Sequence, residues 1–401
     1  MTTATDVIAI EKDHLLQVYR RGSVVFERGR GCRLFDADGR SYLDLISGVG
    51  VAALGHAHPR LAAAISAQAQ ELLHTSNLFF HPLQGELAAR LSTLSGLPRA
   101  FFCNSGTEAV EASLKFARRY WHTQGHPRPG FVALEHSFHG RTMGSLSVTW
   151  DDHYRAPFAP LIPDVTFVPA DDPAALAAAV TDRTGAVIVE PIQGEGGVRP
   201  ISAAMAAAIN DACSRTGALL IADEVQCGLG RTGRAFCSPS LGLRPDLMAI
   251  GKSLGAGVPI AATLFSDRVA AAAAFGDHGS TYGGNLLACR AALVFLEELV
   301  DNGLMAHVAK VGAHAEARLH ALAARHPYIR AVRGAGLMWG LELDRPAAPI
   351  LDAALQQGLL VNRTAETVIR LLPPYIITAA EIDEAMGLLD AALTAAFGGR
   401  Q

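Results

Sequence analysis

The sequence predicts an α/β fold, with a mainly parallel sheet covered by helices in a large domain and a smaller α+β domain after it. From about residue 60, helical patterns alternate with short apolar strands, an order typical of parallel sheets because parallel strands need helical crossovers. After about residue 285, a helix, a hairpin-like stretch and further helices replace that alternation. A chain of 401 residues, 50% of them hydrophobic, is long enough for both domains.

The predicted elements follow in order along the chain. Residues 32–48 predict a hairpin with its turn at Asp38–Gly39, and helical periodicity covers 61–73 and 106–121. Short apolar runs predict buried strands at 100–104, 130–135, 184–191, 217–225 and 247–252. A long helix at 286–303 and a hairpin at 329–344 lead to a helix, a strand and a final helix. We therefore expect 1–49 to join the small domain, 50–285 to form the large domain and 286–401 to form the small one.

The composition argues against several kinds of partner. The formal net charge is −4 and no long block carries one sign, so neither a nucleic-acid groove nor a membrane-surface patch is expected. The N-terminal stretch lacks a basic start, an apolar core and a small-residue cleavage site, and no apolar run reaches the length of a membrane span. The cysteines form no CxxC pair and are expected to stay reduced in a cytoplasm: Cys32, Cys103, Cys213, Cys227, Cys237 and Cys289.

Reactive residues stand where the predicted strands end, which is where ligands bind in parallel α/β sheets. The stretch LMAIGKSLGAG ends an apolar strand on Lys252 and continues with small residues. Asp223 ends another apolar strand in the same way. Ser105 begins a helix after a third strand, and backbone N–H groups at such a helix start can bind a phosphate. Taken alone, Ser105 is better explained as an ordinary helix cap.

A lysine, an acid and a phosphate site at three strand ends together indicate pyridoxal phosphate. A lysine forms a Schiff base with this cofactor, and an acid beside the pyridine nitrogen keeps that nitrogen protonated. The small residues 253–257 would leave room for the cofactor and a substrate near Lys252. The chain has three other lysines, and they lie in polar or helical contexts: Lys12, Lys115 and Lys310.

Two nucleotide-binding motifs are weaker interpretations of the same glycines. The GKS at 251–253 resembles the end of a P-loop, but that motif needs a glycine where Asp246 stands. The GLGRTG at 228–233 fits GxGxxG, yet residues 223–227 intervene after the strand, and no helical pattern follows. An NAD-dependent oxidoreductase is therefore the weak competitor.

Histidine spacing gives little support for a metal site, and none is expected. His136 and His139 are three residues apart, but no acidic or cysteine partner accompanies them and a turn at Gly140 argues against a helix. His56 and His58 suit a loop or packing role. Glu190 could support the site or the fold, and the sequence leaves both readings open.

The chain resembles the class III, fold-type I aminotransferases from about residue 31 to residue 378. The motifs that carry the resemblance are ALGHAHP, LHTSNLF, FFCNSGTEA, HSFHGRT, VEPIQGEGG, LLIADEVQCGLGRTG, GKSLGAGVPI and GDHGSTYGGN. The resemblance implies a pyridoxal-phosphate enzyme whose large domain has a sheet of the seven-stranded type. The sequence departs from the family pattern at Val110 and Leu286, outside the catalytic positions.

The resemblance also implies roles for the cofactor-binding residues. Lys252 would form the Schiff base and then carry a proton between substrate carbons. Asp223 would pair with the pyridine nitrogen and Gln226 would contact the ring hydroxyl. Phe138 and Val225 would lie on the two faces of the ring. The other implied cofactor-binding positions are Ser105, Gly106, Thr107 and Glu224.

Substrate contacts follow from the resemblance in the same way. Arg141 would bind a substrate carboxylate, a task suited to a bidentate guanidinium. Arg370 would bind a second carboxylate, with Glu195 as its gate. Thr281 would reach the phosphate of the other subunit, with Ser280 near the substrate, which implies a homodimer with shared active sites.

The implied reaction moves the terminal amine of N2-acetyl-L-ornithine to 2-oxoglutarate by ping-pong transfer. It would give N-acetyl-L-glutamate 5-semialdehyde and L-glutamate, a step of arginine biosynthesis. Related donors stay open as alternatives, namely succinylornithine, ornithine and 4-aminobutyrate, as does a mutase on the same scaffold. A non-catalytic regulator that binds pyridoxal phosphate is the alternative of another class, which Lys252 and Asp223 argue against.

Overall fold

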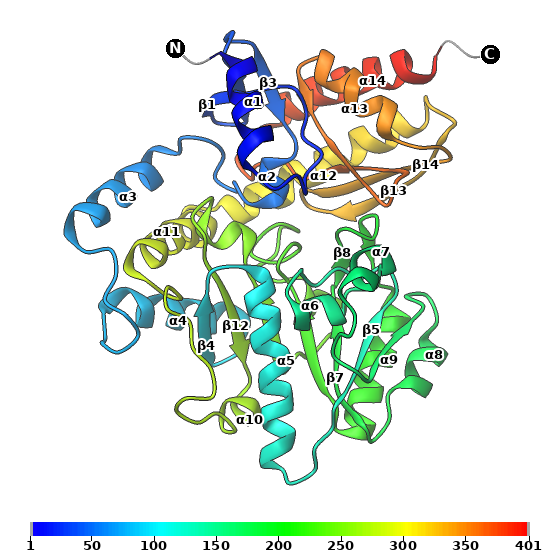
Figure 1. Ribbon diagram of the computed structural model, residues 1–401. Coiled ribbons are helices and arrows are strands. Elements are labelled where there is room, and N and C mark those ends of the chain that lie inside the picture. Colours follow the sequence, from blue (N-terminus) through cyan, green and yellow to red (C-terminus); the bar gives the residue numbers. More distant parts are fainter. Residues whose placement is uncertain (1–2, 399–401) are drawn as a thin grey trace.

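The computed structural model describes residues 3–398 and has the predicted α/β fold. A mainly parallel sheet of seven strands occupies the lower part of the molecule in Figure 1, and the N-terminal strands lie in the upper part together with α12 (Leu304–Ala323), α13 (Ala348–Gln356) and α14 (Ala379–Phe397). The upper part also contains a mixed α/β arrangement around the hairpin of β13 (Ile329–Ala335) and β14 (Met338–Leu343).

The large sheet has the strand order β4-β12-β11-β10-β7-β5-β6. In this order β12 runs antiparallel to β4 and β11, and the pairs from β11 to β6 are parallel. The sequence predicted five of these strands and missed β6 and β12. The strands are β4 (Arg99–Cys103), β5 (Gly130–Leu134), β6 (Val165–Val168), β7 (Thr184–Val189), β10 (Leu219–Asp223), β11 (Leu247–Ile250) and β12 (Ala261–Phe265).

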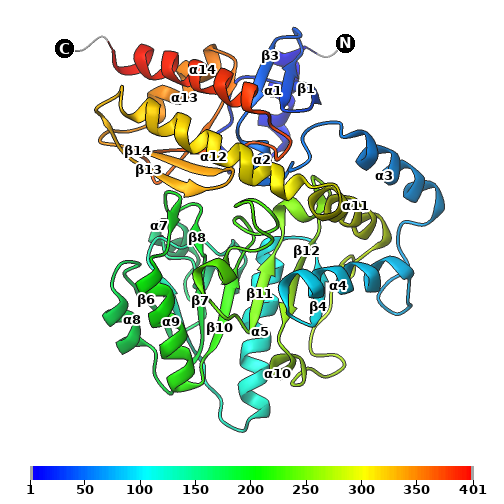
Figure 2. The ribbon, with the colours of Figure 1, turned by 180° about the vertical axis from the view of Figure 1, so that it is seen from behind.

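Both faces of the sheet are buried, which explains the continuous apolar runs of its strands. Leu247 and Ala249 of β11 pack in one cluster with α5, whereas Met248 and Ile250 pack in another with α11. In Figure 2, which views the molecule from behind, α8 and α9 lie at the left of the sheet and α4 and α11 at the right. Helix α5 covers the opposite face, in front of the sheet in Figure 1. These helices are α4 (Pro82–Ser95), α5 (Gly106–Thr123), α8 (Pro173–Ala179), α9 (Ala203–Thr216) and α11 (Leu286–Leu296).

The two predicted hairpins both form. The first turns at Gly39, whose φ of 79° suits a residue without a side chain, and it joins β2 (Arg33–Asp36) to β3 (Ser41–Asp44). Strand β3 then pairs in parallel with β15 (Leu359–Leu360), so the two ends of the chain share one sheet. The second hairpin continues into β17 (Val368–Leu371) and β16 (Asn362–Thr364).

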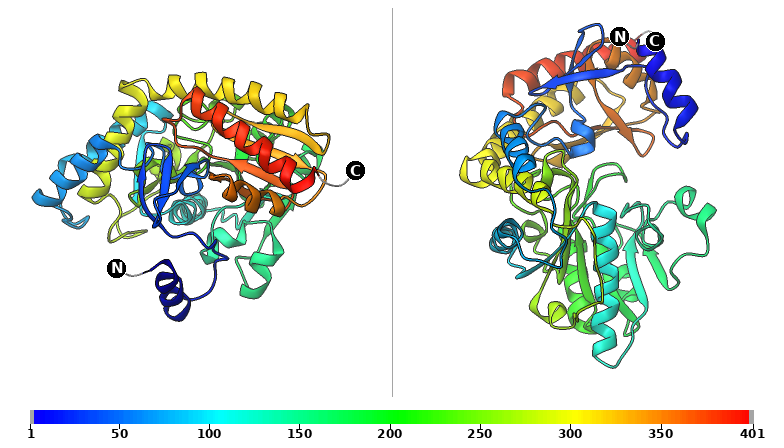
Figure 3. Two further views of the ribbon diagram at one scale, coloured as in Figure 1. Left: turned by 90° about the horizontal axis from the view of Figure 1, so that it is seen from above. Right: turned by 60° about the vertical axis from the view of Figure 1, so that its left-hand side comes forward.

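The remaining elements are short or lie at the periphery. Helix α1 has no buried residue and stands apart from the rest of the molecule in Figure 3. They are α1 (Ala4–His14), β1 (Phe26–Arg30), α2 (Ser47–Gly50), α3 (Pro59–Glu71), α6 (Met143–Ser147), α7 (Asp152–Arg155), η1 (Ala156–Phe158), β8 (Ile192–Gln193), β9 (Arg199–Pro200), η2 (Ser238–Leu241), η3 (Lys252–Gly255), α10 (Asp267–Ala270) and η4 (Glu297–Asp301).

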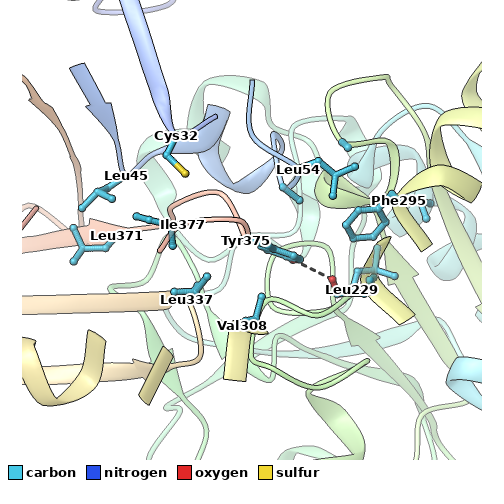
Figure 4. Packing of buried hydrophobic residues seen from close by; sticks show 14 of the residues in the cluster. Cys32, Leu45, Leu54, Leu229, Phe295, Val308, Leu337, Leu371, Tyr375 and Ile377 are labelled. Atoms are coloured by element: carbon cyan, nitrogen blue, oxygen red, sulfur yellow. Dashed lines mark hydrogen bonds between the residues drawn. The ribbon is translucent and has the colours of Figure 1, made fainter. Parts of the chain in front are cut away.

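One buried core connects the upper and lower parts. Figure 4 shows Cys32, Leu337 and Ile377 from the upper part near Leu229 and Phe295 from the lower part, within a single apolar cluster. A hydrogen bond also joins the two parts within this cluster, because the hydroxyl of Tyr375 donates to the backbone oxygen of Leu229 at 3.0 Å. The two parts are therefore held together by packing as well as by the chain.

Arg231 crosses the same boundary. Its side chain is fully buried and donates to the backbone oxygens of Leu337, at 3.0 Å, and Pro373, at 2.6 Å. The guanidinium also lies over the ring of Tyr375, 4.4 Å from the ring centre. The GLGRTG stretch that fits a nucleotide motif thus supplies a contact between the lower and upper parts of the molecule.

The described residues contain no helix long and apolar enough to cross a membrane. All six cysteines are free and buried, and no cluster of three potential metal ligands occurs between residues 3 and 398.

The packing of α12 against the second hairpin can be tested with a glycine pair. A Cβ atom on Gly312 would lie 2.6 Å from backbone atoms of Gly336, so Gly312→Ala should lower the free energy of unfolding by about 1–3 kcal/mol. A Cβ atom on Gly387 of α14 would meet nothing within 4 Å. Gly387→Ala should therefore stabilise the protein by about 0.5–1 kcal/mol through helix propensity alone. Urea denaturation measures the free energy of unfolding of both variants, and equal changes in that free energy would contradict this packing.

Candidate active site

Lys252 lies at the carboxyl end of β11, where the chain turns into a short 3-10 helix, η3. Its φ of 42° lies in the left-handed region, which is uncommon outside glycine. The preceding Gly251 passes close to the start of α5, since a Cβ atom there would lie 3.5 Å from the Cα of Gly106. The small residues after Lys252 have a packing reason too, because a Cβ atom on Gly255 would lie 2.8 Å from Ile260.

The amine of Lys252 lies among four charged side chains. Burial lowers the pKa of Lys252, the charge of Glu195 opposes that shift, and Arg370 lowers the pKa further. Asp223 and Glu190 act on it more weakly. The result is an amine that gives up its proton more readily than a lysine in water.

Asp223 ends β10 and is buried, as its position in the sequence predicted. One carboxylate oxygen accepts the backbone N–H of Val225 at 3.1 Å, and the other lies 2.8 Å from Nδ1 of His139. An ionised carboxylate has no proton to donate, so the imidazole N–H is the donor. The sequence had suggested no role for His139, although it follows β5 at the edge where the other polar residues gather.

Glu190 completes this buried group just after β7. Its carboxylate accepts the backbone N–H groups of Phe138 and Gly194, both at 2.9 Å. Burial raises the pKa of Glu190 to about 7, with Asp223 adding to the rise and His139 opposing it. The reading that Glu190 supports the site is thus favoured by geometry, because it holds the backbone of the loop that carries Phe138.

The start of α5 provides the predicted helix terminus. Ser105 caps the helix: its side-chain oxygen accepts from the backbone N–H of Glu108 and its hydroxyl donates to the Glu108 carboxylate at 2.8 Å. Gly106 is required by a close approach, because a Cβ atom there would lie 2.6 Å from Val225. The hydroxyl of Thr107 lies 2.6 Å from that of Ser145.

Arg141 lies exposed at the edge of the site. Its guanidinium stacks on Tyr154, 3.6 Å from the ring centre, and lies 5.4 Å from the ring centre of Phe138. Its backbone N–H donates to the hydroxyl of Thr107 at 3.2 Å. The structure therefore brings three of the sequence-predicted residues together around the start of α5, with Arg141 free of any carboxylate partner among the described residues.

Arg370 and Glu195 form an ion pair, as the gate predicted from the resemblance requires. Arg370 projects from β17, has a relative exposure of 2%, and donates through one nitrogen both to the Glu195 carboxylate and to Gln226 at 3.3 Å. Burial acts to raise the pKa of Glu195, but the charges of Arg370 and Lys252 outweigh it and lower the pKa. The side chain of Gln226 packs directly against Gly194, because a Cβ atom on Gly194 would lie 2.3 Å from the side-chain oxygen of Gln226.

Glu224 follows Asp223 directly after β10, and its expected contact with the cofactor stays a prediction. Its buried carboxylate accepts the backbone N–H groups of Cys237, at 2.9 Å, and Ser238, at 2.5 Å. The hydroxyl of Ser238 donates to it as well, at 2.6 Å. The side chain at this position supports the following loop, because successive residues after a strand point in different directions.

Ser280 and Thr281 occupy a segment between α10 and α11. The side chain of Asn104, at the end of β4, lies 3.4 Å from the Ser280 hydroxyl, so Ser280 reaches the edge of the site. Thr281 is exposed, and its side chain forms no hydrogen bond with the described residues 3–398 of its own chain.

The residues present fit pyridoxal phosphate. The start of α5 offers free backbone N–H groups for a phosphate, and glycine at Gly106 and Gly140 keeps that space open, since a Cβ atom on Gly140 would lie 2.3 Å from Thr107. Lys252 supplies a buried amine and Asp223 a buried carboxylate for the ring. This donor set matches an anionic phosphate at one end and a protonated pyridine at the other.

Comparisons with known proteins agree with this geometry. The family model for class-III aminotransferases matches residues 17–393. The chain is 43% identical over 391 residues to the acetylornithine aminotransferase of Methanocaldococcus jannaschii, covering 96% of this chain and 98% of that relative.

Solved structures give the same result. The ornithine aminotransferase of Toxoplasma gondii superposes with a TM-score of 0.95 at 32% identity, covering 100% of this chain and 97% of that one. An amine transaminase from an uncultivated Pseudomonas species, solved with pyridoxal phosphate bound, has a TM-score of 0.88 at 33% identity and covers 95% and 97%. The chain therefore belongs to the class-III aminotransferases, enzymes that depend on pyridoxal phosphate.

Proposed function

We propose that this enzyme transfers the terminal amine of N2-acetyl-L-ornithine to 2-oxoglutarate, as a step of arginine biosynthesis. The observation that carries the proposal is the ion pair of Arg370 with Glu195 beside Lys252, which suits a site that must accept two unlike donors. The relative named acetylornithine aminotransferase, which matches nearly the full chain, supports the choice of donor.

Lys252 is the residue that would move the proton. Bound pyridoxal phosphate supplies an electron-accepting ring that makes the C–H bond next to the amine acidic. Burial lowers the pKa of Lys252, so its Nζ can take a proton from one carbon and return it to another. Lys252 follows the fully buried strand β11, so its side chain extends from a backbone that is held in the sheet.

Asp223 would hold the negative charge that faces the pyridine nitrogen. His139 donates to the far oxygen of that carboxylate, which fixes the orientation of Asp223. Glu190 braces the backbone at Phe138, so the residue proposed to lie on one ring face is positioned from the same buried group. Val225, next to Gly106, would contact the other face.

Arg141 and Arg370 would bind different substrate carboxylates. Acetylornithine has one carboxylate, far from the reacting amine, and glutamate has two. Arg141 would bind the remote carboxylate of either donor, and Arg370 would bind only the α-carboxylate of glutamate. When acetylornithine is bound, Glu195 would pair with Arg370, because a buried cation without a partner is costly.

We also propose that the enzyme is a homodimer that works in the cytoplasm. Large apolar side chains are exposed on two neighbouring segments, with relative exposures of 84% for Leu78, 106% for Phe80 and 111% for Phe275. Asn77 donates to the backbone of Ser280 at 3.1 Å, which joins the two segments. Such a patch is unusual on a monomer, and a second copy would bring Thr281 of that patch towards a neighbouring site. Six free cysteines suit a reducing compartment.

A donor screen tests the proposed substrate. Each amine is added alone to the enzyme, and the change in the absorbance of the bound cofactor reports a single half-reaction. Acetylornithine should react faster than ornithine and 4-aminobutyrate, and a clear preference for either of those would overturn the proposed donor.

Lys252→Ala should reduce turnover by several orders of magnitude, because the nucleophile and the proton carrier are lost together. Cofactor binding should persist through the helix start and Asp223, and absorbance after gel filtration measures it. Lys310, exposed on α12, gives a matched control, and Lys310→Ala should behave as wild type. Turnover near the wild-type value in Lys252→Ala would contradict the assignment.

Arg370→Ala should damage the glutamate half-reaction more than the acetylornithine half-reaction, by more than about tenfold, because one charge-assisted pair contributes roughly 2–5 kcal/mol. Arg141→Ala should slow both halves. Single-turnover rates measured with each donor decide between these patterns. Equal losses in both halves for Arg370→Ala would rule out the switch.

Mixed dimers test whether the sites are shared. A dimer of one Lys252→Ala subunit and one Thr281→Ala subunit would contain one site in which both residues are native, if Thr281 serves the neighbouring subunit. Its activity should reach about half that of the wild-type dimer. Sites built from one chain would give only half the activity of the Thr281→Ala parent, which must be measured under limiting cofactor.

A further inference from the structure

Glu111 is a charged residue of α5 to which neither the resemblance nor the proposed reaction assigns a role. It lies one helical turn after Thr107, and residues four apart in a helix share one face. Its carboxylate oxygen Oε1 accepts three donors from the start of α6: the hydroxyl of Thr142 and the backbone N–H groups of Gly144, at 2.8 Å, and Ser145, at 3.1 Å. Within the described residues it pairs with no cation, so the charge of Glu111 is directed at this one segment.

The segment held by Glu111, residues 140–145, carries Arg141. The side chain of Arg141 is exposed, so the backbone on either side decides where its guanidinium lies. The backbone N–H of Arg141 donates to the hydroxyl of Thr107 at 3.2 Å. A Cβ atom on Gly144 would lie 2.1 Å from Oε2 of Glu111, so the segment approaches the carboxylate closely because residue 144 is glycine. The segment is therefore fixed at two points of one helix face.

Three hydroxyl groups connect Glu111 to the start of α5, and their protons have a fixed direction. Because a carboxylate only accepts, the hydroxyl of Thr142 must donate to Glu111, and its oxygen is left as an acceptor. The hydroxyl oxygen of Thr107 accepts the backbone N–H groups of Arg141, at 3.2 Å, and Thr142, at 3.3 Å, so its own proton is left to donate. It lies 2.6 Å from the hydroxyl of Ser145 and 3.0 Å from that of Thr142. The charge of Glu111 thus favours Thr107 as a donor, which is the role that an anionic phosphate requires.

We propose that Glu111 is a positioning residue that serves both ends of the site. It holds the segment that places Arg141 for the donor's carboxylate, and it orients the hydroxyl proton of Thr107 for the cofactor phosphate. Because one charge has both effects, phosphate binding and carboxylate binding are coupled through a residue that acts on each indirectly. The proposal rests on the proposed function, since it takes Arg141 as the partner of the remote carboxylate.

The carboxylate effect is tested with two donors in single-turnover half-reactions: N2-acetyl-L-ornithine and N-acetyl-1,4-diaminobutane, which is the same molecule without its carboxylate. Glu111→Ala should lower the preference for acetylornithine by at least about tenfold, because a displaced guanidinium loses its geometry with the carboxylate. The rate with the diaminobutane should stay close to that of the wild type. In an Arg141→Ala background, Glu111→Ala should lower the preference no further, since both changes remove the same interaction.

The phosphate effect has a readout that does not require turnover. The dissociation constants of pyridoxal phosphate and of pyridoxal, which lacks the phosphate, are measured on the apoenzyme by absorbance. Glu111→Ala should reduce the advantage of pyridoxal phosphate over pyridoxal by about fivefold, because one charge-assisted hydrogen bond is weakened. Glu111→Gln keeps an acceptor oxygen without the charge and should give intermediate values in both tests. Glu316, exposed on α12, gives the matched control, and Glu316→Ala should behave as wild type.

Thr142→Val removes the hydroxyl between Glu111 and Thr107, and it should lower both the donor preference and the phosphate advantage should Glu111→Ala fail to fold. Equal slowing of both donors by Glu111→Ala, or a loss that adds to that of Arg141→Ala, would overturn the proposal as a general loss of structure. An unchanged phosphate advantage would overturn the coupling.

The single variant Arg141→Ala separates the proposal from the proposed function. If it leaves the preference for acetylornithine intact, the carboxylate assignment of the proposed function fails, and the role of Glu111 fails with it. A large effect of Arg141→Ala without any effect of Glu111→Ala would overturn the role of Glu111 alone.

Discussion

The site depends on a balance of buried charge around the amine of Lys252. Two cations, Lys252 and Arg370, lie with two anions, Glu195 and Asp223; Arg370 and Asp223 are buried, and Lys252 and Glu195 are partly exposed. Removing one member of such a group leaves an uncompensated buried charge, which costs about 3–5 kcal/mol. The balance also sets the chemistry, because the same neighbours that stabilise the cations determine how readily Lys252 releases its proton.

This balance can form only when the upper and lower parts of the molecule come together. Lys252 and Asp223 lie at the carboxyl ends of strands of the large sheet, whereas Arg370 lies in β17 of a separate four-stranded sheet. The apolar cluster around Tyr375 and the buried guanidinium of Arg231 hold the two parts in that relation. The core between them therefore has a direct consequence for the site: a change that shifts β17 would separate Arg370 from Glu195.

The sequence predicted what local patterns determine, and missed what only tertiary contacts determine. Lys252 and Asp223 could be identified because each ends an apolar strand, and parallel strands bring such ends to one edge. Strand β12 (Ala261–Phe265) was missed because it runs antiparallel to both neighbours and so falls outside the alternation of helix and strand that identified the parallel strands. The contact of His139 with Asp223 joins residues 84 apart along the chain, and no spacing rule connects them.

The side chains of Glu224 and Arg199 also show what could not be predicted from the sequence. The resemblance implies that Glu224 contacts the cofactor, and the structure adds that the turn after β10 directs its carboxylate to the backbone N–H groups of Cys237 and Ser238. The sequence had suggested no role for Arg199, and only the fold shows that its Nε is buried without a hydrogen-bond partner. Side-chain direction after a strand is decided by the loop's packing, which a pattern of residue types does not encode.

The buried group of His139, Asp223 and Glu190 fixes the direction of the carboxylate that would face the pyridine ring. His139 donates through Nδ1 to one oxygen of Asp223, and the backbone N–H of Val225 donates to the other oxygen. Because both oxygens are held, the carboxylate keeps one orientation. Glu190 accepts the backbone N–H groups of Phe138 and Gly194, so the loop that carries His139 is held by the same group. An acid that faces a pyridine nitrogen requires such a fixed orientation, because the place of its charge decides whether that nitrogen stays protonated.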